Sequence, residues 1–76
     1  MKDLLEFIVK ALVDDPAAVD IEIVPKGDIQ IYKLKTAKED VGKVIGKRGK
    51  NARALRTILK SISAKEGRKT VLEIVD

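Results

Sequence analysis

The sequence predicts an α+β fold in which helices cover one face of a three-stranded mixed sheet. Apolar residues recur at helical spacing in two stretches, one near the N-terminus and one after residue 50. Between these stretches, two alternating runs flank a turn, and a short β-branched run ends the chain. With 76 residues the chain is expected to form one domain spanning 1–76, because there is no room for a second core.

The first expected element is a helix over residues 2–14. Its apolar side is expected to consist of Leu4, Leu5, Ile8, Ala11 and Leu12. Asp14-Asp15-Pro16 should end the helix, because a residue that precedes proline is displaced from the α region.

An antiparallel hairpin is expected next, with strands over residues 18–24 and 29–35. Val19, Ile21 and Ile23 alternate with acidic residues, which is typical of a half-buried strand. Residues 25–28, with the sequence PKGD, have the composition of a turn. The second strand has apolar residues on both sides, and we therefore expect it in the middle of the sheet.

Two helices should follow the hairpin. Thr36 and Glu39 match a capping box, and the short helix after them is expected to turn Val41, Val44 and Ile45 inward and to end at Gly46. The next helix should begin near Gly49-Lys50 or Asn51 and end at Gly67. Its expected inner stripe is Ala52, Leu55, Ile58, Leu59 and Ile62, and its outer stripe includes Arg53, Arg56 and Lys60.

Residues 70–75, with the sequence TVLEIV, are expected to form the last strand. The order is then α-β-β-α-α-β. Because two helices connect the second strand to the third, these strands should run parallel with a right-handed crossover.

The composition argues against an enzyme. The chain has neither cysteine nor histidine, so thiol chemistry, the commonest general base and the commonest transition-metal ligands are missing. No dinucleotide-binding or Walker pattern is present. We expect no catalytic residues, no metal site and no cofactor. Without an apolar run of membrane-spanning length or a signal segment, the expected location is the cytoplasm.

Positive charge is concentrated around a glycine-rich turn. Residues 38–69 contain eleven Lys or Arg against three acidic residues, whereas the net charge of the chain is +4. Within this segment, Gly46-Lys47-Arg48-Gly49 can form a tight turn that admits close approach of another backbone. Cations beside such a turn suit a phosphate chain. A plain helix–helix turn surrounded by solvated lysines is the alternative.

The residues around this turn resemble a known family. Val44-Ile45-Gly46-Lys47-Arg48-Gly49 resembles the V-I-G-x-x-G core of KH domains, and the order α-β-β-α-α-β is that of type II KH domains. The longer string over residues 39–56 is similar to the small stand-alone bacterial KH proteins of the KhpA (YlqC-like) family. The resemblance covers essentially the whole chain.

The resemblance implies non-catalytic binding of single-stranded RNA, in which the Gly-x-x-Gly turn clamps the backbone of about four nucleotides. Carried over by position, Gly46 and Gly49 form the turn and Lys47 and Arg48 meet the phosphates. The remaining implied contacts are the flanking cations Lys43, Lys50 and Arg53, the groove residues Val44, Ile45 and Ala52, and a far wall near Val71 and Leu72. Val44, Ile45 and Leu55 could equally be core residues.

The implied role is that of a post-transcriptional regulator or RNA chaperone. Only Phe7 and Tyr32 are aromatic and neither lies in the basic segment, so binding by one domain should be weak and salt-sensitive. The family also implies pairing, either as a homodimer or with a larger KH protein of the KhpB/Jag type. Ile58 and Ile62 are candidate seam residues, although they could be core. A protein-assembly subunit is the alternative function, and single-stranded DNA remains open as a ligand.

Overall fold

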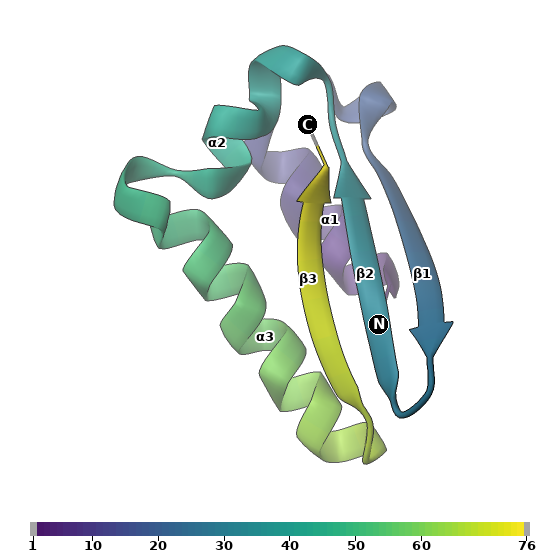
Figure 1. Cartoon of the computed structure of the whole chain (residues 1–76). Coiled ribbons are helices and arrows are strands. Elements are labelled where there is room, and N and C mark those ends of the chain that lie inside the picture. The colour runs from purple at the N-terminus through teal and green to yellow at the C-terminus, as the bar shows by residue number, and fades with distance from the viewer. Residues whose placement is uncertain (1, 76) are drawn as a thin grey trace.

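The computed structural model describes residues 2–75 and has the expected order of elements (Figure 1). Three short 3₁₀ turns, at Pro16–Ala18, Lys38–Asp40 and Lys47–Gly49, lie in the connections. The helices and strands are α1 (Lys2–Leu12), β1 (Asp20–Lys26), β2 (Ile29–Lys35), α2 (Val41–Ile45), α3 (Lys50–Glu66) and β3 (Lys69–Val75).

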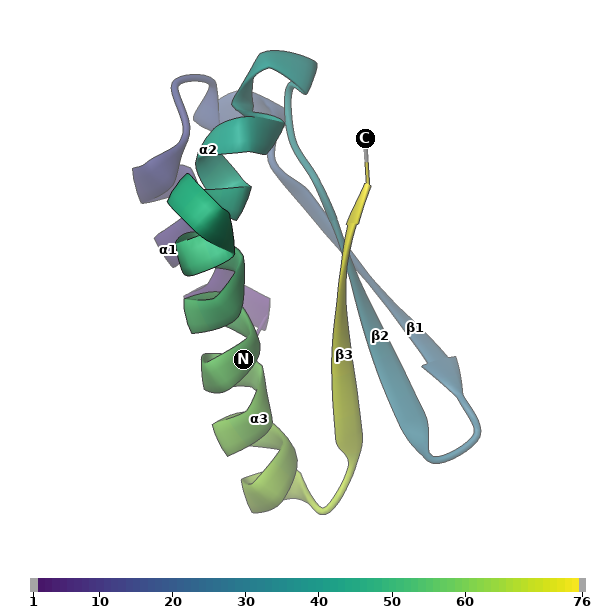
Figure 2. The same cartoon turned by 60° about the vertical axis from the view of Figure 1, so that its left-hand side comes forward.

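The sheet has the strand order β1-β2-β3, with β1 antiparallel and β3 parallel to β2. This confirms the mixed sheet, the central position of β2 and the parallel crossover. All three helices lie on one side of the sheet, and no element within residues 2–75 covers its other side (Figure 2). The strand β3 is an edge strand, and α3 runs beside it.

The hairpin turn is shorter than predicted. β1 continues through Pro25 and Lys26, which pair with Gln30 and Ile29, so only Gly27 and Asp28 form the turn. Gly27 has φ +62°, which favours glycine at this position. Proline is tolerated within β1 because β1 is an edge strand and proline lacks only the N–H that a second neighbour would need.

The helix α1 ends at Leu12 and presents a different side to the sheet than predicted. Leu5 and Val9 are fully buried, and Val13 packs below them just after the helix. Leu4, by contrast, is 45% exposed and Ala11 is also exposed. The helix is rotated by about one position relative to the predicted stripe, because Leu4, Leu5, Phe7, Ile8 and Val9 supply more apolar side chains than one face can bury.

The predicted capping box does not form. Thr36 donates its hydroxyl hydrogen to the carbonyl of Ala37 at 3.2 Å, and Ala37 precedes a 3₁₀ turn without a side-chain cap. That turn contains Glu39 and separates Thr36 from the start of α2. The buried carboxylate of Asp40 instead accepts a hydrogen bond from the N–H of Asp15 at 3.0 Å, which joins the end of α1 to the start of α2.

The core lies between the helices and the sheet. The predicted inner stripe of α3 is confirmed for Ala52, Leu55, Leu59 and Ile62, while Ile58 is half-buried. The main core residues from other elements are Leu5, Val9, Ile21, Tyr32, Leu34, Val44 and Leu72. Within residues 2–75, no helix combines the length and apolar character needed to cross a membrane.

Candidate nucleic-acid interface

The four residues Gly46–Gly49 form a sharply bent loop between α2 and α3. Gly46, Arg48 and Gly49 have φ values of +75°, +56° and +72°, in the left-handed region that favours glycine. Among residues 2–75, Arg48 is the single non-glycine residue with a positive φ. The N–H of Gly49 donates to the carbonyl of Gly46 at 3.1 Å and closes the turn.

Asn51 holds the two ends of this loop together. Its Nδ2 donates to the carbonyl of Lys43 at 2.8 Å, which ties the first turn of α3 to α2. A Cβ atom on Gly46 would lie 2.7 Å from Cγ of Asn51 and 2.9 Å from its backbone nitrogen. Gly46 is therefore required by the close approach of Asn51 as well as by its φ. The sequence marked Asn51 only as a possible helix start, since nothing in the pattern indicates its contact with Lys43.

The loop presents unpaired positive charge. Lys47 and Arg48 are exposed, and neither they nor Lys50 take part in an ion pair within residues 2–75. Nη2 of Arg53 lies 3.5 Å from the carbonyl of Arg48, so Arg53 stays close to the loop. These four cations, which the sequence predicted as site residues, are gathered around the start of α3.

The N-terminus of α3 adds to this positive potential. Gly49 precedes the helix without a side-chain cap, so no side chain occupies the first N–H groups of α3. A helix N-terminus carries a partial positive charge and offers N–H donors to an anion. Loop, cations and helix end therefore favour the same ligand, a phosphate group.

Lys43 differs from the other predicted cations because it is already paired. Its ammonium group donates to the carboxylate of Asp14, just beyond the end of α1. This hydrogen bond raises the pKa of Lys43 above its ordinary value, and the charges of Asp14 and Asp40 act in the same direction. The carboxylate of Asp14 therefore offsets the charge that Lys43 can offer to a phosphate.

The two apolar site residues of α2 have different positions. Val44 is fully buried, and its side chain belongs to the core. Ile45 is 38% exposed, so the prediction that it faces inward with Val44 is wrong. Because α2 has only five residues, it buries a single side chain, that of Val44, and Ile45 lies on the surface immediately before Gly46.

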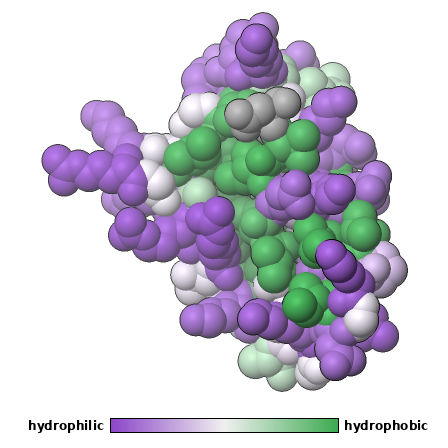
Figure 3. Space-filling model, viewed as in Figure 1, coloured by the Kyte–Doolittle hydropathy of each residue, from purple (hydrophilic) through white to green (hydrophobic). Residues whose placement is uncertain are grey.

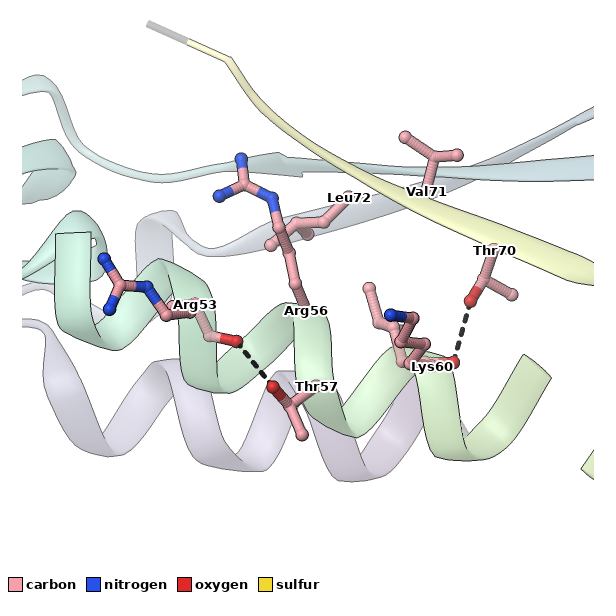
Figure 4. A pocket seen from close by; sticks show the side chains of 8 residues that line it. Arg53, Arg56, Thr57, Lys60, Thr70, Val71 and Leu72 are labelled. Carbon is pink, nitrogen blue, oxygen red and sulfur yellow. Dashed lines mark hydrogen bonds between the residues drawn. The ribbon is translucent and has the colours of Figure 1, made fainter. Parts of the chain in front are cut away.

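A groove of about 370 Å³ lies between α3 and the free edge of β3. In Figure 4, Arg56 extends from α3 toward β3, and Arg53 extends along α3 toward its N-terminal end. The predicted far wall is present, with Leu72 buried and Val71 40% exposed. The lining residues are Arg53, Arg56, Thr57, Leu59, Lys60, Thr70, Val71 and Leu72.

The hydroxyl groups of the groove are directed at the protein backbone. Thr57 donates to the carbonyl of Arg53 at 3.0 Å, and Thr70 donates to the carbonyl of Leu59 at 2.8 Å, which joins β3 to α3 (Figure 4). The mobile hydrogen-bond donors left in the groove are the side chains of Arg53, Arg56 and Lys60. The sequence pattern indicates Arg56 and Lys60 only as residues of the outer stripe of α3, because periodicity does not show how close β3 lies to that stripe.

This arrangement suits binding of a polyanion. Within residues 2–75 no three Asp or Glu side chains converge on a possible metal position. What the surface offers is a glycine loop open to close approach, a cluster of cations and an apolar wall.

Comparison with known proteins gives a full-length match. The family model described as KhpA/KhpB, KH domain, matches residues 2–74. The "RNA-binding protein KhpA" of Clostridium perfringens is 47% identical over 75 residues, covering 99% of this chain and all of the relative. The protein of the same name from Chlamydia caviae is 45% identical over 76 residues, covering all of this chain and 97% of the relative.

A solved structure has a similar fold. The crystal structure of a variant of Aquifex aeolicus Era bound to GDP·AlF4⁻ superimposes with a TM-score of 0.58 at 17% identity. The similarity covers 95% of this chain but only 28% of the Era chain. At this identity the likeness concerns the fold alone.

Proposed function

Because the chain belongs to the KhpA/KhpB KH-domain family, which is non-enzymatic, we propose that it binds single-stranded RNA through the Gly46–Gly49 loop. Lys47 and Arg48 contact phosphates, and Lys50 and Arg53 contribute further charge. The exposed side chains of Ile45 and Val71 contact the bases. The curated relatives bear the name of an RNA-binding protein, which supports RNA as the ligand.

One observation carries this proposal: Arg53 joins the glycine loop to the basic groove, because its Nη2 lies 3.5 Å from the carbonyl of Arg48 and its side chain lines the groove. The loop ends where α3 begins, and Arg53, Arg56 and Lys60 of α3 continue the positive charge along the groove. A single strand clamped at the loop can therefore keep electrostatic contact over the next nucleotides. A helix–helix turn with only a structural role would not need this continuation.

The groove also limits how tightly RNA can be held. The ring of Tyr32 is buried in the core between the sheet and the helices, and that of Phe7 is exposed on α1, so neither aromatic ring lines the groove. Stacking on aromatic rings contributes about 1–3 kcal/mol per base in other single-strand binders and is missing here. The expected binding is weak, strongly dependent on salt and tolerant of sequence. Such binding suits a post-transcriptional regulator or RNA chaperone in the cytoplasm.

The test is binding of a labelled single-stranded RNA to wild type and to the double variant Lys47→Asp/Arg48→Asp, each at two salt concentrations. Wild-type binding should weaken with salt, and the double variant should not bind. Lys10→Asp/Lys65→Asp is the control, because it changes the net charge equally at positions outside the groove. Equal loss in both variants would mean that net charge alone attracts the RNA. A matched DNA strand tests whether the 2′-hydroxyl contributes.

A second candidate function is assembly with another protein, and an apolar surface on the helices favours it. Phe7 is 73% exposed and Leu4 is 45% exposed. Beside Leu4, a hollow of about 250 Å³ is lined by Leu4, Ile58, Ser61, Ile62 and Lys65. The partner would be a second copy or a larger KH protein of the KhpB/Jag type, in agreement with a family model that covers both KhpA and KhpB.

The two functions can be separated by paired variants. Phe7→Ser should weaken association with a KhpB-type partner and leave RNA binding unchanged. The double aspartate at Lys47 and Arg48 should do the reverse. If the double aspartate also abolishes partner binding, RNA bridges the two proteins and the helical surface is not their contact.

A further inference from the structure

A second basic depression lies where the chain turns from α3 into β3. This α3–β3 hollow has a volume of about 460 Å³. Its lining includes Lys60, Ser63, Gly67, Arg68, Lys69 and Thr70. Because Lys60 and Thr70 also line the groove between α3 and β3, the two depressions are adjacent and share part of their walls.

Ser63 fixes the turn that forms this hollow. Its hydroxyl group donates to the carbonyl of Arg68 and accepts the N–H of Thr70 at 3.1 Å, which joins the end of α3 to the start of β3. The N–H of Gly67 donates to the carbonyl of Ser63 at 3.0 Å and ends the helix. Since the hydroxyl groups of Ser63 and Thr70 both donate to the backbone, the mobile hydrogen-bond donors of the hollow are its basic side chains.

The basic side chains of the hollow have no acidic partner. Lys60, Arg68 and Lys69 are exposed, and the two ion pairs among residues 2–75 involve other lysines. Of the residues that the structure describes, no Asp or Glu lines either depression. Arg53, Arg56 and Lys60 follow one another at intervals of three and four residues, which places them on one side of α3. The positive charge therefore continues along α3 as far as its C-terminal turn.

The boundary between polar and apolar surface follows the same course. In Figure 3, hydrophobic residues gather over the strands, and hydrophilic side chains flank them over α3. Val71 of β3 is 40% exposed and directly follows Thr70, which lines both depressions. A strand of RNA that follows this boundary keeps its phosphates beside α3 and its bases beside β3.

The C-terminal end of α3 accounts for only part of this charge. The end of a helix carries a partial negative charge, which favours nearby cations. Lys65, in the last turn of α3, satisfies this preference without lining the α3–β3 hollow. Arg68 and Lys69 instead line the same hollow as Lys60, which a purely structural role would not require.

We propose that a longer RNA strand continues from the groove into the α3–β3 hollow, where Arg68 and Lys69 contact phosphates beyond those held at the loop. This inference rests on the proposed RNA binding at Gly46–Gly49. The hollow extends that site and does not replace it, because the end of α3 at the hollow carries a partial negative charge and the end at the loop a partial positive one. The loop is thus the stronger phosphate site and the hollow the weaker one.

The length of α3 determines which RNA reaches both sites. Its 17 residues span about 25 Å. A stacked strand advances about 3.4 Å per nucleotide, so about seven nucleotides cover this distance. A tetranucleotide clamped at the loop has only three such steps and stays within the loop and groove, whereas a decanucleotide is long enough to reach the hollow.

The test is the binding of a labelled uridine tetranucleotide and a labelled uridine decanucleotide, measured by fluorescence anisotropy at several salt concentrations. Wild type should bind the decanucleotide more tightly and with a salt slope steeper by about 1.4, because two further phosphates are neutralised at about 0.7 each. Arg68→Gln/Lys69→Gln should weaken decanucleotide binding several-fold and remove the steeper slope. The same variant should change tetranucleotide binding by less than about twofold, since that RNA neutralises no phosphate in the hollow.

The matched control is Lys10→Gln/Lys65→Gln. It removes the same charge at exposed positions outside both depressions, and Lys65 represents the cations that only accompany the end of α3. Both RNAs should bind this variant as they bind wild type. Thermal unfolding midpoints of the two variants show whether either substitution disturbs the fold.

The outcomes separate this inference from the proposed function. Unchanged decanucleotide binding in Arg68→Gln/Lys69→Gln would overturn the inference and leave RNA binding at the loop intact. An equal loss for both RNAs would overturn it too, since the tetranucleotide does not need the hollow. If wild type binds neither RNA, or if Lys47→Asp/Arg48→Asp leaves both affinities unchanged, the proposed function itself fails and the inference fails with it.

Discussion

Single residues at the loop have distinct structural and ligand-binding roles. Gly46 is confined by a positive φ and by the contact with Asn51, whereas Gly49 has a positive φ but open space where a Cβ would lie. Gly42 lies within α2, without a positive φ and with open space around it. The three glycines therefore allow the contributions of backbone conformation, steric contact and charge to be separated.

We expect Gly46→Ala to lower the free energy of unfolding by at least about 1–3 kcal/mol, the range for a residue forced into an unfavourable backbone region. The clash with Asn51 adds to this loss and should shift the loop, so RNA affinity should fall as well. Urea denaturation measures the stability. Gly42→Ala is the control and should be neutral or stabilising by about 0.4–1 kcal/mol, because it only restricts the unfolded chain. Equal destabilisation by both variants would contradict the special role of Gly46.

Gly49 tests whether phosphate approaches the loop. Asn and Asp both tolerate the left-handed region better than other residues with a Cβ, and they have nearly the same shape. Gly49→Asn and Gly49→Asp should therefore have similar thermal unfolding midpoints, each somewhat below that of wild type. Only Gly49→Asp places a negative charge where phosphate is expected, and its RNA affinity should be clearly lower than that of Gly49→Asn. If the two variants bind RNA equally well, the ligand does not pass over Gly49.

At the scale of whole elements, α3 joins the loop to the groove. Its buried residues fix the helix against the sheet, and the cations on its exposed side line the groove beside β3. Arg56→Gln should weaken RNA binding several-fold without a preference for sequence and flatten the salt slope by about 0.7. Lys65→Gln, on α3 but outside the groove, is the matched control in a filter-binding titration. A loss confined to particular RNA sequences would instead mean that Arg56 contacts a base.

The elements differ in how well the sequence predicted them. β2 and α3 were predicted closely, because one has apolar residues on both sides and the other has a regular stripe bounded by Gly49 and Gly67. The orientation of α1 was not, since its surplus of apolar residues allows more than one buried face. The capping box at Thr36 matched a local pattern that a 3₁₀ turn overrode.

Only part of the site could be predicted, because some of its residues are adjacent in sequence and others are brought together by tertiary packing. Residues adjacent in sequence, such as Lys47 and Arg48, could be assigned together because the loop itself brings them together. Arg56 and Lys60 join the site only because β3 lies beside α3, which is a tertiary relation. The partner of Lys43 depends on how α1 packs against α2, and periodicity carries no information about that packing.

For the molecule as a whole, the relevant property is the separation of charge. Residues 38–69 contain eleven Lys or Arg and three acidic residues, while the rest of the chain is net acidic. The structure places Lys47, Arg48 and Lys50 at the loop and Arg53, Arg56 and Lys60 along the groove. The basic residues of this segment are thus gathered at the loop and along the groove.

This separation predicts how RNA binding depends on salt. For single strands, the logarithm of the binding constant falls with the logarithm of salt concentration by about 0.7 for each phosphate neutralised. If about four cations of the loop and groove contact phosphates, the slope should be near −3, measured by fluorescence anisotropy. Lys47→Gln/Arg48→Gln should flatten the slope by about 1.4. Lys10→Gln/Lys65→Gln removes the same charge outside the groove and should leave the slope almost unchanged, because counterions are released only where phosphates are contacted. A wild-type slope near zero would mean that RNA is held without phosphate contacts, and the clamp would have to be abandoned.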